Sequence, residues 1–132
     1  MLAANQGTEQ KPPRILAAVR DLFFVGKITA AAKRVGVPVE FVQDETEVIQ
    51  KTDSSPAMLI LDLNDPWLNP IQMIAKLKAD PLRKEVRVVG FLSHVLEDLK
   101  REAHQAGCDV VLPRSVFSQN LDELLRQRSC HL

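Results

Sequence analysis

Short apolar runs alternate with amphipathic helical stripes five times along this chain, and the alternation restricts the folds that the chain can adopt. The apolar runs, each interpreted as a strand, span residues 15–19, 37–43, 58–62, 86–92 and 110–112. Helical stripes, in which apolar residues recur every three or four positions, are expected over 22–35, 45–52, 70–79, 95–106 and 121–125. Strands that alternate with helices of this size form βαβ units with right-handed crossovers. We therefore predict one doubly wound α/β domain, whose parallel sheet carries helices on both faces.

Several of the expected helix ends carry their own signals. Gly36 and Gly107 directly follow the first and fourth stripes, where glycine commonly ends a helix. Asn69-Pro70 supplies a capping side chain and a proline at the first helical position. Asp80-Pro81 is expected to end the same helix, because the residue before a proline is pushed out of the helical region. Ser118 is expected to cap the last helix.

The length and composition of the chain are those of a single soluble globular domain. Its 132 residues are enough for one hydrophobic core, and 45% of them are hydrophobic and 26% charged. Seventeen basic and seventeen acidic residues cancel, so we expect neither a nucleic acid nor a membrane as partner. No apolar stretch approaches the length of a membrane-spanning helix. We expect a flexible N-terminal leader at 1–13, the domain at 14–128 and a C-terminal tail at 129–132.

The two cysteines indicate where the protein resides. Cys108 and Cys130 fit a reducing cytoplasm better than a disulfide framework, so we expect a cytoplasmic protein. Cys108 lies where a strand begins and is expected to be a small buried residue. Cys130 and His131 lack further partners for a metal site, and we interpret them as part of a frayed tail.

A parallel sheet brings the carboxyl ends of its strands to one edge, where open α/β folds bind their ligands. The residues expected there are Val19, Arg20 and Asp21 after the first strand, Asp62 at the end of the third, Ser93 and His94 after the fourth, and Arg114 after the fifth. Asp62 is the most informative of them, because it places a carboxylate directly at the end of an apolar strand. Its chemistry depends on which of the other residues surround it.

Three segments make a family resemblance visible. They read Leu-Ile-Leu-Asp-Leu-Asn-Asp-Pro at 59–66, Leu-Lys-Ala-Asp-Pro at 77–81 and Ala-Gly-Cys-Asp at 106–109. In combination they make the chain resemble the response-regulator receiver domain of two-component signalling, in the CheY-like superfamily, over nearly all of residues 14–128. The resemblance implies a flavodoxin-like (βα)5 fold with five parallel strands in the order 2-1-3-4-5. It also implies a part in signal transduction by phosphorelay, with no enzyme activity of its own.

The resemblance assigns roles to three residues. Asp62 falls on the phosphoacceptor aspartate of the family. Ser93 falls on its conserved hydroxyl residue, which contacts the phosphoryl group. Arg114 stands in the place of its invariant lysine, and is the equivalent phosphoryl contact.

The magnesium ligands of the family are not retained. Val19 and Arg20 stand where receivers carry two acidic residues, and Asp21, one residue further on, is the remaining candidate ligand. Ser115 replaces the proline that follows the lysine, and Val111 replaces the aromatic switch residue of the fifth strand. Because magnesium needs several oxygen ligands in near-octahedral geometry, we expect this metal site to be weak or absent, and we predict no cofactor.

An arginine has the chemistry to take over the electrostatic role of the missing metal. Arginine keeps its charge and can grip a carboxylate with two donors, so such a pair is hard to displace. We therefore hypothesise that Arg20 or Arg114 reaches Asp62 and neutralises it permanently.

Two functions compete. The first is a pseudo-receiver that binds a protein partner, a histidine kinase or another signalling protein, without standard magnesium-dependent phosphorylation. The resemblance implies that the face of the fourth helix, fifth strand and fifth helix serves this docking or a homodimer. The alternative is a working receiver that a histidine kinase phosphorylates on Asp62, with magnesium. A flavin- or nucleotide-binding domain is disfavoured, because residues 20–26 lack the glycine- or hydroxyl-rich loop that such ligands need.

The other candidate residues each have an ordinary structural explanation. Ser93 is also suited to cap the helix that follows it, and His94 is expected to be an exposed loop residue. Trp67 is expected to pack over the start of the third helix, although tryptophan is also enriched at partner contacts. His104 falls on the polar side of its helix and needs no function.

Overall fold

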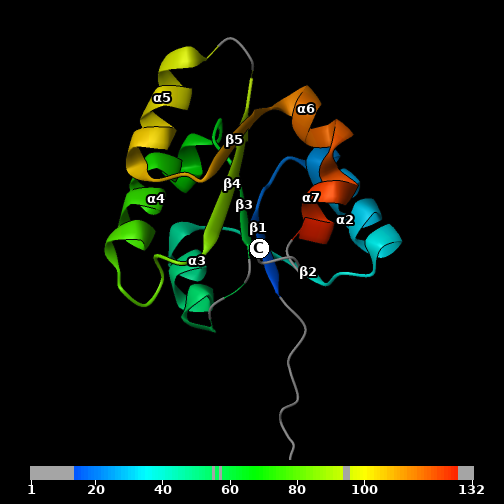
Figure 1. The fold of residues 1–132 in the computed structure, drawn as a ribbon, viewed down its shortest axis with the longest axis horizontal. Coiled ribbons are helices and arrows are strands. Elements are labelled where there is room, and N and C mark those ends of the chain that lie inside the picture. Colours follow the sequence, from blue (N-terminus) through cyan, green and yellow to red (C-terminus); the bar gives the residue numbers. More distant parts are fainter. Residues whose placement is uncertain (1–13, 55, 57, 94–95, 128–132) are drawn as a thin grey trace, which may run out of the picture.

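The computed structural model describes residues 14–54, 56, 58–93 and 96–127, and these form the α/β domain shown in Figure 1. Within them, five parallel strands make one sheet in the order β2-β1-β3-β4-β5. The strands are β1 (Ile15–Ala18), β2 (Val39–Val42), β3 (Met58–Asp62), β4 (Arg87–Leu92) and β5 (Val110–Pro113). The helices are α2 (Leu22–Val35), α3 (Glu45–Lys51), α4 (Pro70–Ala79), α5 (Glu97–Ala106), α6 (Arg114–Gln119) and α7 (Leu121–Gln127), with short 3-10 turns η2 (Thr52–Ser54) and η3 (Pro66–Leu68). The predicted fold class and strand order are confirmed.

Each face of the sheet has its own hydrophobic core. Because successive side chains of a strand point to opposite faces, β1 contributes to both cores. Leu16 and Ala18 pack with residues of α4 and α5, whereas Ile15 and Ala17 pack with residues of α2 and α7. Figure 1 shows α3, α4 and α5 on one side of the sheet, and α2, α6 and α7 on the other. As a result β3 is buried along its whole length, and its last residue reaches the surface only at the carboxyl edge.

Most of the predicted helix ends are confirmed. Gly36 ends α2 and Gly107 ends α5, both in the left-handed conformation, with φ of 79° and 113°. Asp80, in extended conformation, ends α4 before its proline. The predicted capping by Asn69 is wrong, because its side chain makes no capping hydrogen bond. Asn69 instead has a φ of 47°, the one positive φ of a non-glycine residue in the described part of the chain.

The helices after β5 differ from the expectation. α6 begins at Arg114, directly after the last residue of β5, and a second helix, α7, begins at Leu121. Ser118 lies inside α6, so its predicted role as the cap of the last helix is wrong. No side chain caps α6 at Pro113, and the start of this helix therefore leaves no capping signal in the sequence.

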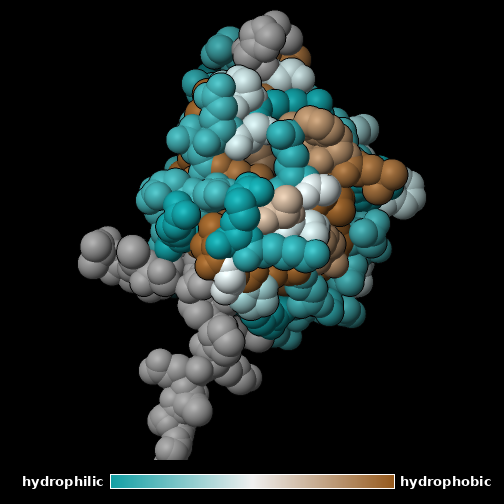
Figure 2. Space-filling view, turned by 90° about the vertical axis from the view of Figure 1, so that its right-hand side faces the viewer, coloured by the Kyte–Doolittle hydropathy of each residue, from teal (hydrophilic) through white to brown (hydrophobic). Residues whose placement is uncertain are grey.

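Some of the sequence-based predictions fall on residues that are not described. These are the leader at 1–13, His94, Cys130, His131 and the tail at 129–132. Within the described ranges, no helix combines the length and the apolar character needed to cross a bilayer. Figure 2 looks at the side of the molecule formed by α2 and α7, where hydrophobic residues appear among hydrophilic ones. Leu22 and Phe23, at the start of α2, are both strongly exposed.

Candidate functional site

The carboxyl ends of the strands surround a cleft of about 450 Å³. Its walls come from the segment after β1, the loop after β3 and the first residue of α6. The residues that line it are Arg20, Asp21, Asp62, Asn64, Asp65, Pro66 and Arg114. The structure therefore brings Asp62, Asp21 and both arginines together, while Ser93 is not part of the lining.

Asp62 is the last residue of β3 and is only 4% exposed. Its Oδ1 accepts a hydrogen bond of 2.9 Å from the backbone N–H of Asn64. Burial raises the pKa of the Asp62 carboxyl above its ordinary value, against the lowering effects of that hydrogen bond and of the positive charge of Arg114. The nearby carboxylates of Asp65 and Asp21 add to the rise of this pKa. On balance, the surroundings of Asp62 disfavour its ionised form.

Arg20 grips Asp65 and leaves Asp62 without a salt bridge. Its Nε and Nη2 donate to the two carboxylate oxygens of Asp65 at 2.8 and 3.0 Å, the bidentate geometry that arginine favours. The Arg20 guanidinium also lies over the ring of Trp67, with its Cζ 5.6 Å from the ring centroid. Hydrogen bonds from Arg20 hold the pKa of the Asp65 carboxyl below its ordinary value, although partial burial acts in the opposite direction. The pair fastens the loop after β3 to the end of β1.

Arg114 approaches Asp62 without pairing with it. Its charge acts on the Asp62 carboxyl through space, but none of the described residues forms an ion pair with either group. The Arg114 guanidinium lies over Phe24, with its Cζ 5.4 Å from the ring centroid, and its Nε is buried with no hydrogen-bond partner. The hypothesis that an arginine grips Asp62 with two donors is therefore wrong. Both groups line the cleft, with no ion pair between them.

The residues of the cleft do not fit a magnesium ion. Asp21 caps α2, where its Oδ1 accepts from the backbone N–H groups of Phe23 and Phe24 at 2.9 and 3.4 Å. Both oxygens of Asp65 are taken by Arg20, and Val19 is fully buried in the core on the α2 side. Among the described residues, no group of three His, Cys, Asp or Glu side chains is arranged to hold a metal. Magnesium needs several oxygen ligands, and the carboxylate oxygens left over in this cleft are those of Asp62 and the second oxygen of Asp21, too few for the ion without rearrangement.

Asn64 is a residue of the site that the sequence analysis missed. Its backbone N–H binds Asp62, and its side-chain Oδ1 accepts from the backbone N–H of Ser93 at 2.8 Å. Asn64 thereby ties the loop after β3 to the end of β4. Ser93 is no helix cap, because α5 begins at Glu97 with Leu96 in the capping position. The Leu-Asn-Asp-Pro segment that follows Asp62 was visible in the sequence, but nothing in it assigned roles to Asn64 or to Asp65.

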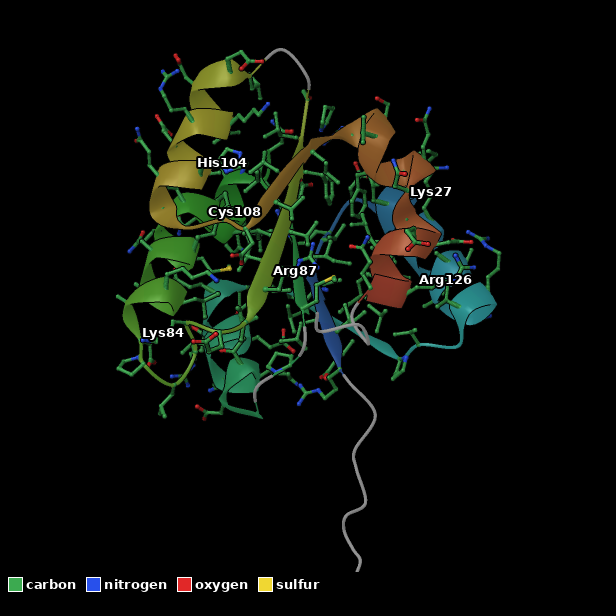
Figure 3. All side chains as sticks on the ribbon, viewed as in Figure 1. Lys27, Lys84, Arg87, His104, Cys108 and Arg126 are labelled. Atoms are coloured by element: carbon green, nitrogen blue, oxygen red, sulfur yellow. The ribbon has the colours of Figure 1, made fainter. Side chains whose placement is uncertain are left out.

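The other candidates lie away from the cleft or at its rim. Trp67 is 66% exposed, so the prediction that it packs over the start of α4 is wrong. Cys108 is buried, as predicted, and burial raises the pKa of its thiol to about 11, which makes it unreactive. Figure 3 shows Cys108 on the connection between α5 and β5, and His104 on α5. His104 is exposed, and Val111, at the position of the aromatic switch, is buried.

Comparison with known proteins places the fold. No family model and no curated protein matches the sequence. Among solved structures, a response regulator from Hahella chejuensis superposes with a TM-score of 0.78 at 16% identity, over 88% of this chain and 94% of that one. A putative response regulator from Chloroflexus aurantiacus gives 0.78 at 18% identity, over 92% of this chain and 100% of that one.

A third similar structure is the receiver domain of a sensor histidine kinase from Pseudomonas aeruginosa, which has a magnesium ion coordinated in its active-site cleft. Its TM-score is 0.75 at 17% identity, over 89% of this chain and 97% of that one. At identities this low the likeness shows the fold: the chain has the CheY-like fold of response-regulator receiver domains.

Proposed function

We propose that this chain is a receiver-like signalling module of the two-component, phosphorelay type that acts by binding a protein partner, without standard magnesium-dependent phosphorylation of Asp62. The proposed role is non-enzymatic and cytoplasmic. Its receiver-like part is supported by the fold shared with response regulators and by the position of Asp62 at the end of β3. The buried free thiol of Cys108 suits a reducing compartment.

The ion pair between Arg20 and Asp65 carries the proposal. Arg20 stands where the resemblance expects an acidic metal ligand, and it binds both oxygens of the neighbouring carboxylate. A guanidinium keeps its charge at every physiological pH, so a change of pH in this range does not release the pair. A phosphoryl transfer to Asp62 needs charge neutralisation at the transferring oxygens, and Arg20 and Asp65 are engaged with each other where the resemblance expects a metal ligand.

We propose that the partner, a histidine kinase or another signalling protein, docks on the face formed by α5, β5, α6 and α7, and that a homodimer would use the same face. On α5, a shallow hollow of about 300 Å³ is lined by side chains of both charges, Glu97, Lys100 and Arg101, together with His104. Mixed charges of this kind favour selective docking over non-specific adhesion.

Phosphorylation of Asp62 is tested by measuring the intact mass of the protein. The protein is incubated with acetyl phosphate and magnesium, and its intact mass is measured beside that of a receiver domain with a complete acidic pair. We expect the reference domain to gain one phosphoryl group and this chain to gain none. An adduct that forms on this chain and is lost in Asp62→Asn would contradict the proposal and establish the alternative, a working receiver phosphorylated on Asp62.

One observation favours that alternative. Asp62 lines an open cleft together with Arg114, whose positive charge acts on the Asp62 carboxyl and would act on a phosphoryl group there. The mass experiment therefore separates two functions that the same cleft could serve.

The proposed docking face is tested by charge reversal. Lys100→Glu changes an exposed residue of α5, and Lys27→Glu makes the same change on α2, on the other side of the sheet. We expect Lys100→Glu to weaken self-association in sedimentation equilibrium, or binding of a cognate kinase, by about tenfold, and Lys27→Glu to leave it unchanged. Equal behaviour of the two variants would exclude this face.

A further inference from the structure

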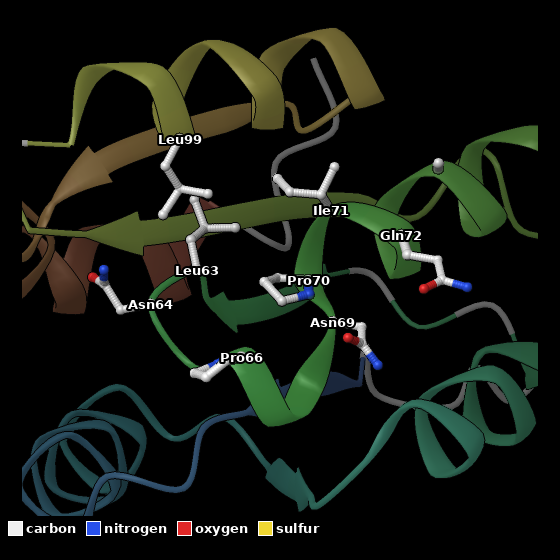
Figure 4. A pocket seen from close by; sticks show the side chains of 9 residues that line it. Leu63, Asn64, Pro66, Asn69, Pro70, Ile71, Gln72 and Leu99 are labelled. Carbon is white, nitrogen blue, oxygen red and sulfur yellow. The ribbon is translucent and has the colours of Figure 1, made fainter.

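A second hollow, of about 640 Å³, lies between α4, α5 and the loop after β3. We call it the α4–α5 groove. Its apolar walls are formed by Leu63, Pro66, Pro70, Ile71, Ala75 and Leu99. Figure 4 shows Leu99 reaching from α5 toward Leu63, with Pro66 and Pro70 along the opposite wall. The proposed function uses neither this groove nor a ligand in it.

The walls of the groove are already formed in the free protein. Leu63 is only 2% exposed, and Leu99 and Ile71 pack against the core on this side of the sheet. Two prolines, Pro66 and Pro70, restrict the backbone along one wall. A pocket of this volume that needs no rearrangement is typical of small-molecule sites.

The lining of the groove is uncharged. None of its lining residues is acidic or basic, although 26% of the whole chain is charged. Three side-chain amides, those of Asn64, Asn69 and Gln72, complete the lining. A charged ligand would lose its hydration here without gaining an ion pair, whereas an uncharged one with hydrogen-bonding groups would find partners.

Two of these amides are available to a ligand. Within the described residues, the side chains of Asn69 and Gln72 have no hydrogen-bond partner, and both are exposed. Asn69 is also the residue with the positive φ of 47°. This left-handed conformation ends η3, where the backbone N–H of Asn69 donates to the carbonyl of Pro66 at 3.1 Å, so the side-chain amide is not used by the turn.

From these observations we propose that the α4–α5 groove binds an uncharged, largely apolar small molecule that carries hydrogen-bonding groups. A ligand in the groove also changes the environment of the Asp62 cleft, because Asn64 lines both hollows. The same residue donates its backbone N–H to Asp62 and accepts the N–H of Ser93 with its side chain.

The inference is tested with two matched probes. N-phenyl-1-naphthylamine is uncharged and carries one N–H, and 8-anilinonaphthalene-1-sulfonate has the same rings with an added sulfonate. We expect saturable binding of the uncharged probe by fluorescence, and binding of the sulfonate that is at least about tenfold weaker. In ¹H–¹⁵N spectra the uncharged probe should shift the amide signals of Asn64, Ile71 and Gln72, and also that of Ser93.

Two matched variants locate the bound probe. Ala75→Phe fills the groove from an exposed position of α4, and Ala30→Phe adds the same ring at an exposed position of α2. Ala75→Phe should lose at least about tenfold in affinity for the uncharged probe, and Ala30→Phe should bind as the parent does.

Three results would overturn the inference. One is tighter or equal binding of the sulfonate, and another is binding that Ala75→Phe leaves intact. The third is a set of shifts centred on Leu22, Phe23 and Trp67, which would show that the probe adheres to exposed hydrophobic residues elsewhere. Native spectra of both variants establish that each has folded, so a loss of binding in Ala75→Phe reports on the groove.

Discussion

Two arginines are largely withdrawn from solvent at opposite edges of the sheet. Arg83 lies at the amino edge, beside the amino ends of the strands, and has a full set of partners. Arg114 lies at the carboxyl edge and does not. Its Nε donates to the carbonyl of Ile49 at 3.1 Å and to the hydroxyl of Thr52 at 3.0 Å. Its two terminal nitrogens pair with Asp80 and Asp53. Arg114, in contrast, has a buried Nε without a hydrogen bond, and it lies near Asp62 with no ion pair to any residue that the structure describes.

Lys78, also near the amino ends of the strands, is fully paired in the same way as Arg83. Its Nζ donates to the carbonyls of Lys84 and Val86 at 3.1 and 2.8 Å, and to the Asp109 carboxylate at 2.9 Å. Asp109 in turn accepts from the backbone N–H of Val88 at 2.8 Å. Polar groups at the amino edge therefore hold loops to strands. At the carboxyl edge Arg20 and Asn64 hold loops in the same way, but the Nε of Arg114 is buried with no hydrogen-bond partner among the described residues. A buried donor without a partner is costly to fold and is kept where a partner or ligand uses it.

The largest effect is expected from Arg83→Met. Methionine preserves much of the apolar stem but leaves the buried hydroxyl of Thr52 without its donor and the carboxylates of Asp80 and Asp53 without their ion pairs. We expect a loss of about 3 kcal/mol in the free energy of unfolding, measured by urea denaturation. Arg101→Met, at an exposed residue paired only with Asp98, is the control and should change stability little. Equal losses in both variants would show that the amino-edge network is not what stabilises the domain.

Asp62→Asn should increase the free energy of unfolding, in contrast to Arg83→Met. The pKa of the Asp62 carboxyl is raised, chiefly by burial, so the ionised form is less favourable in the folded protein than in the unfolded chain. The amide removes this penalty, and we expect about 1 kcal/mol of added stability at neutral pH.

The pH dependence of the Asp62→Asn effect follows from the direction of the shift. A raised folded-state pKa costs stability above that pKa, where the carboxyl is ionised in both states. The cost disappears below the unfolded pKa, where the group is protonated in both. The advantage of Asp62→Asn should therefore be full at neutral pH and vanish as the pH falls through this window. An advantage that persists at acid pH would mean that it arises from something other than ionisation.

Arg114→Met makes the same substitution at the carboxyl edge and should have a much smaller effect. It removes a guanidinium whose Nε has no partner and keeps an apolar side chain beside Phe24. We expect a change within about 0.5 kcal/mol. Loss of the positive charge should raise the pKa of Asp62 further, which ¹³C spectra of the carboxyl would measure. A loss of stability as large as that of Arg83→Met would erase the difference between the two edges.

The position of the site in the fold could be predicted from the sequence, because it depends on short-range patterns. An apolar run that ends in Asp62, together with Gly36 and Gly107 as helix ends, fixes which residues reach the carboxyl edge. The pairing inside the cleft could not be predicted. Arg20 had Asp62 and Asp65 within the same reach, and only the path of the loop after β3 decides between them.

The start of α6 was missed for a different reason. No side chain caps the helix, so local sequence offered no boundary before Ser118. The conformation of Asn69 escaped prediction because asparagine before proline equally suits a capping position and a left-handed turn.

The last substitution, Arg20→Asp, tests whether the carboxyl edge can hold a magnesium ion once the guanidinium is replaced by a carboxylate. The substitution releases Asp65 from its ion pair and adds a carboxylate near Asp62. We expect a slight fall of the urea midpoint without magnesium and its recovery with magnesium, because carboxylates that repel one another together bind the ion. The parent protein should not respond to magnesium.

Magnesium binding by Arg20→Asp can be followed through the fluorescence of Trp67, the one tryptophan of the chain, whose ring contacts Arg20 in the parent. Arg20→Gln is the matched control, since it breaks the ion pair with Asp65 without adding a carboxylate. A saturable response in Arg20→Asp alone would show that the charge at this one position excludes the metal. A response in the parent would contradict the misfit that we describe. If magnesium changes the fluorescence of none of the three proteins, the charge at Arg20 is not what prevents magnesium binding. The cause would then lie with Val19, which is buried in the core, and with Asp21, which caps α2.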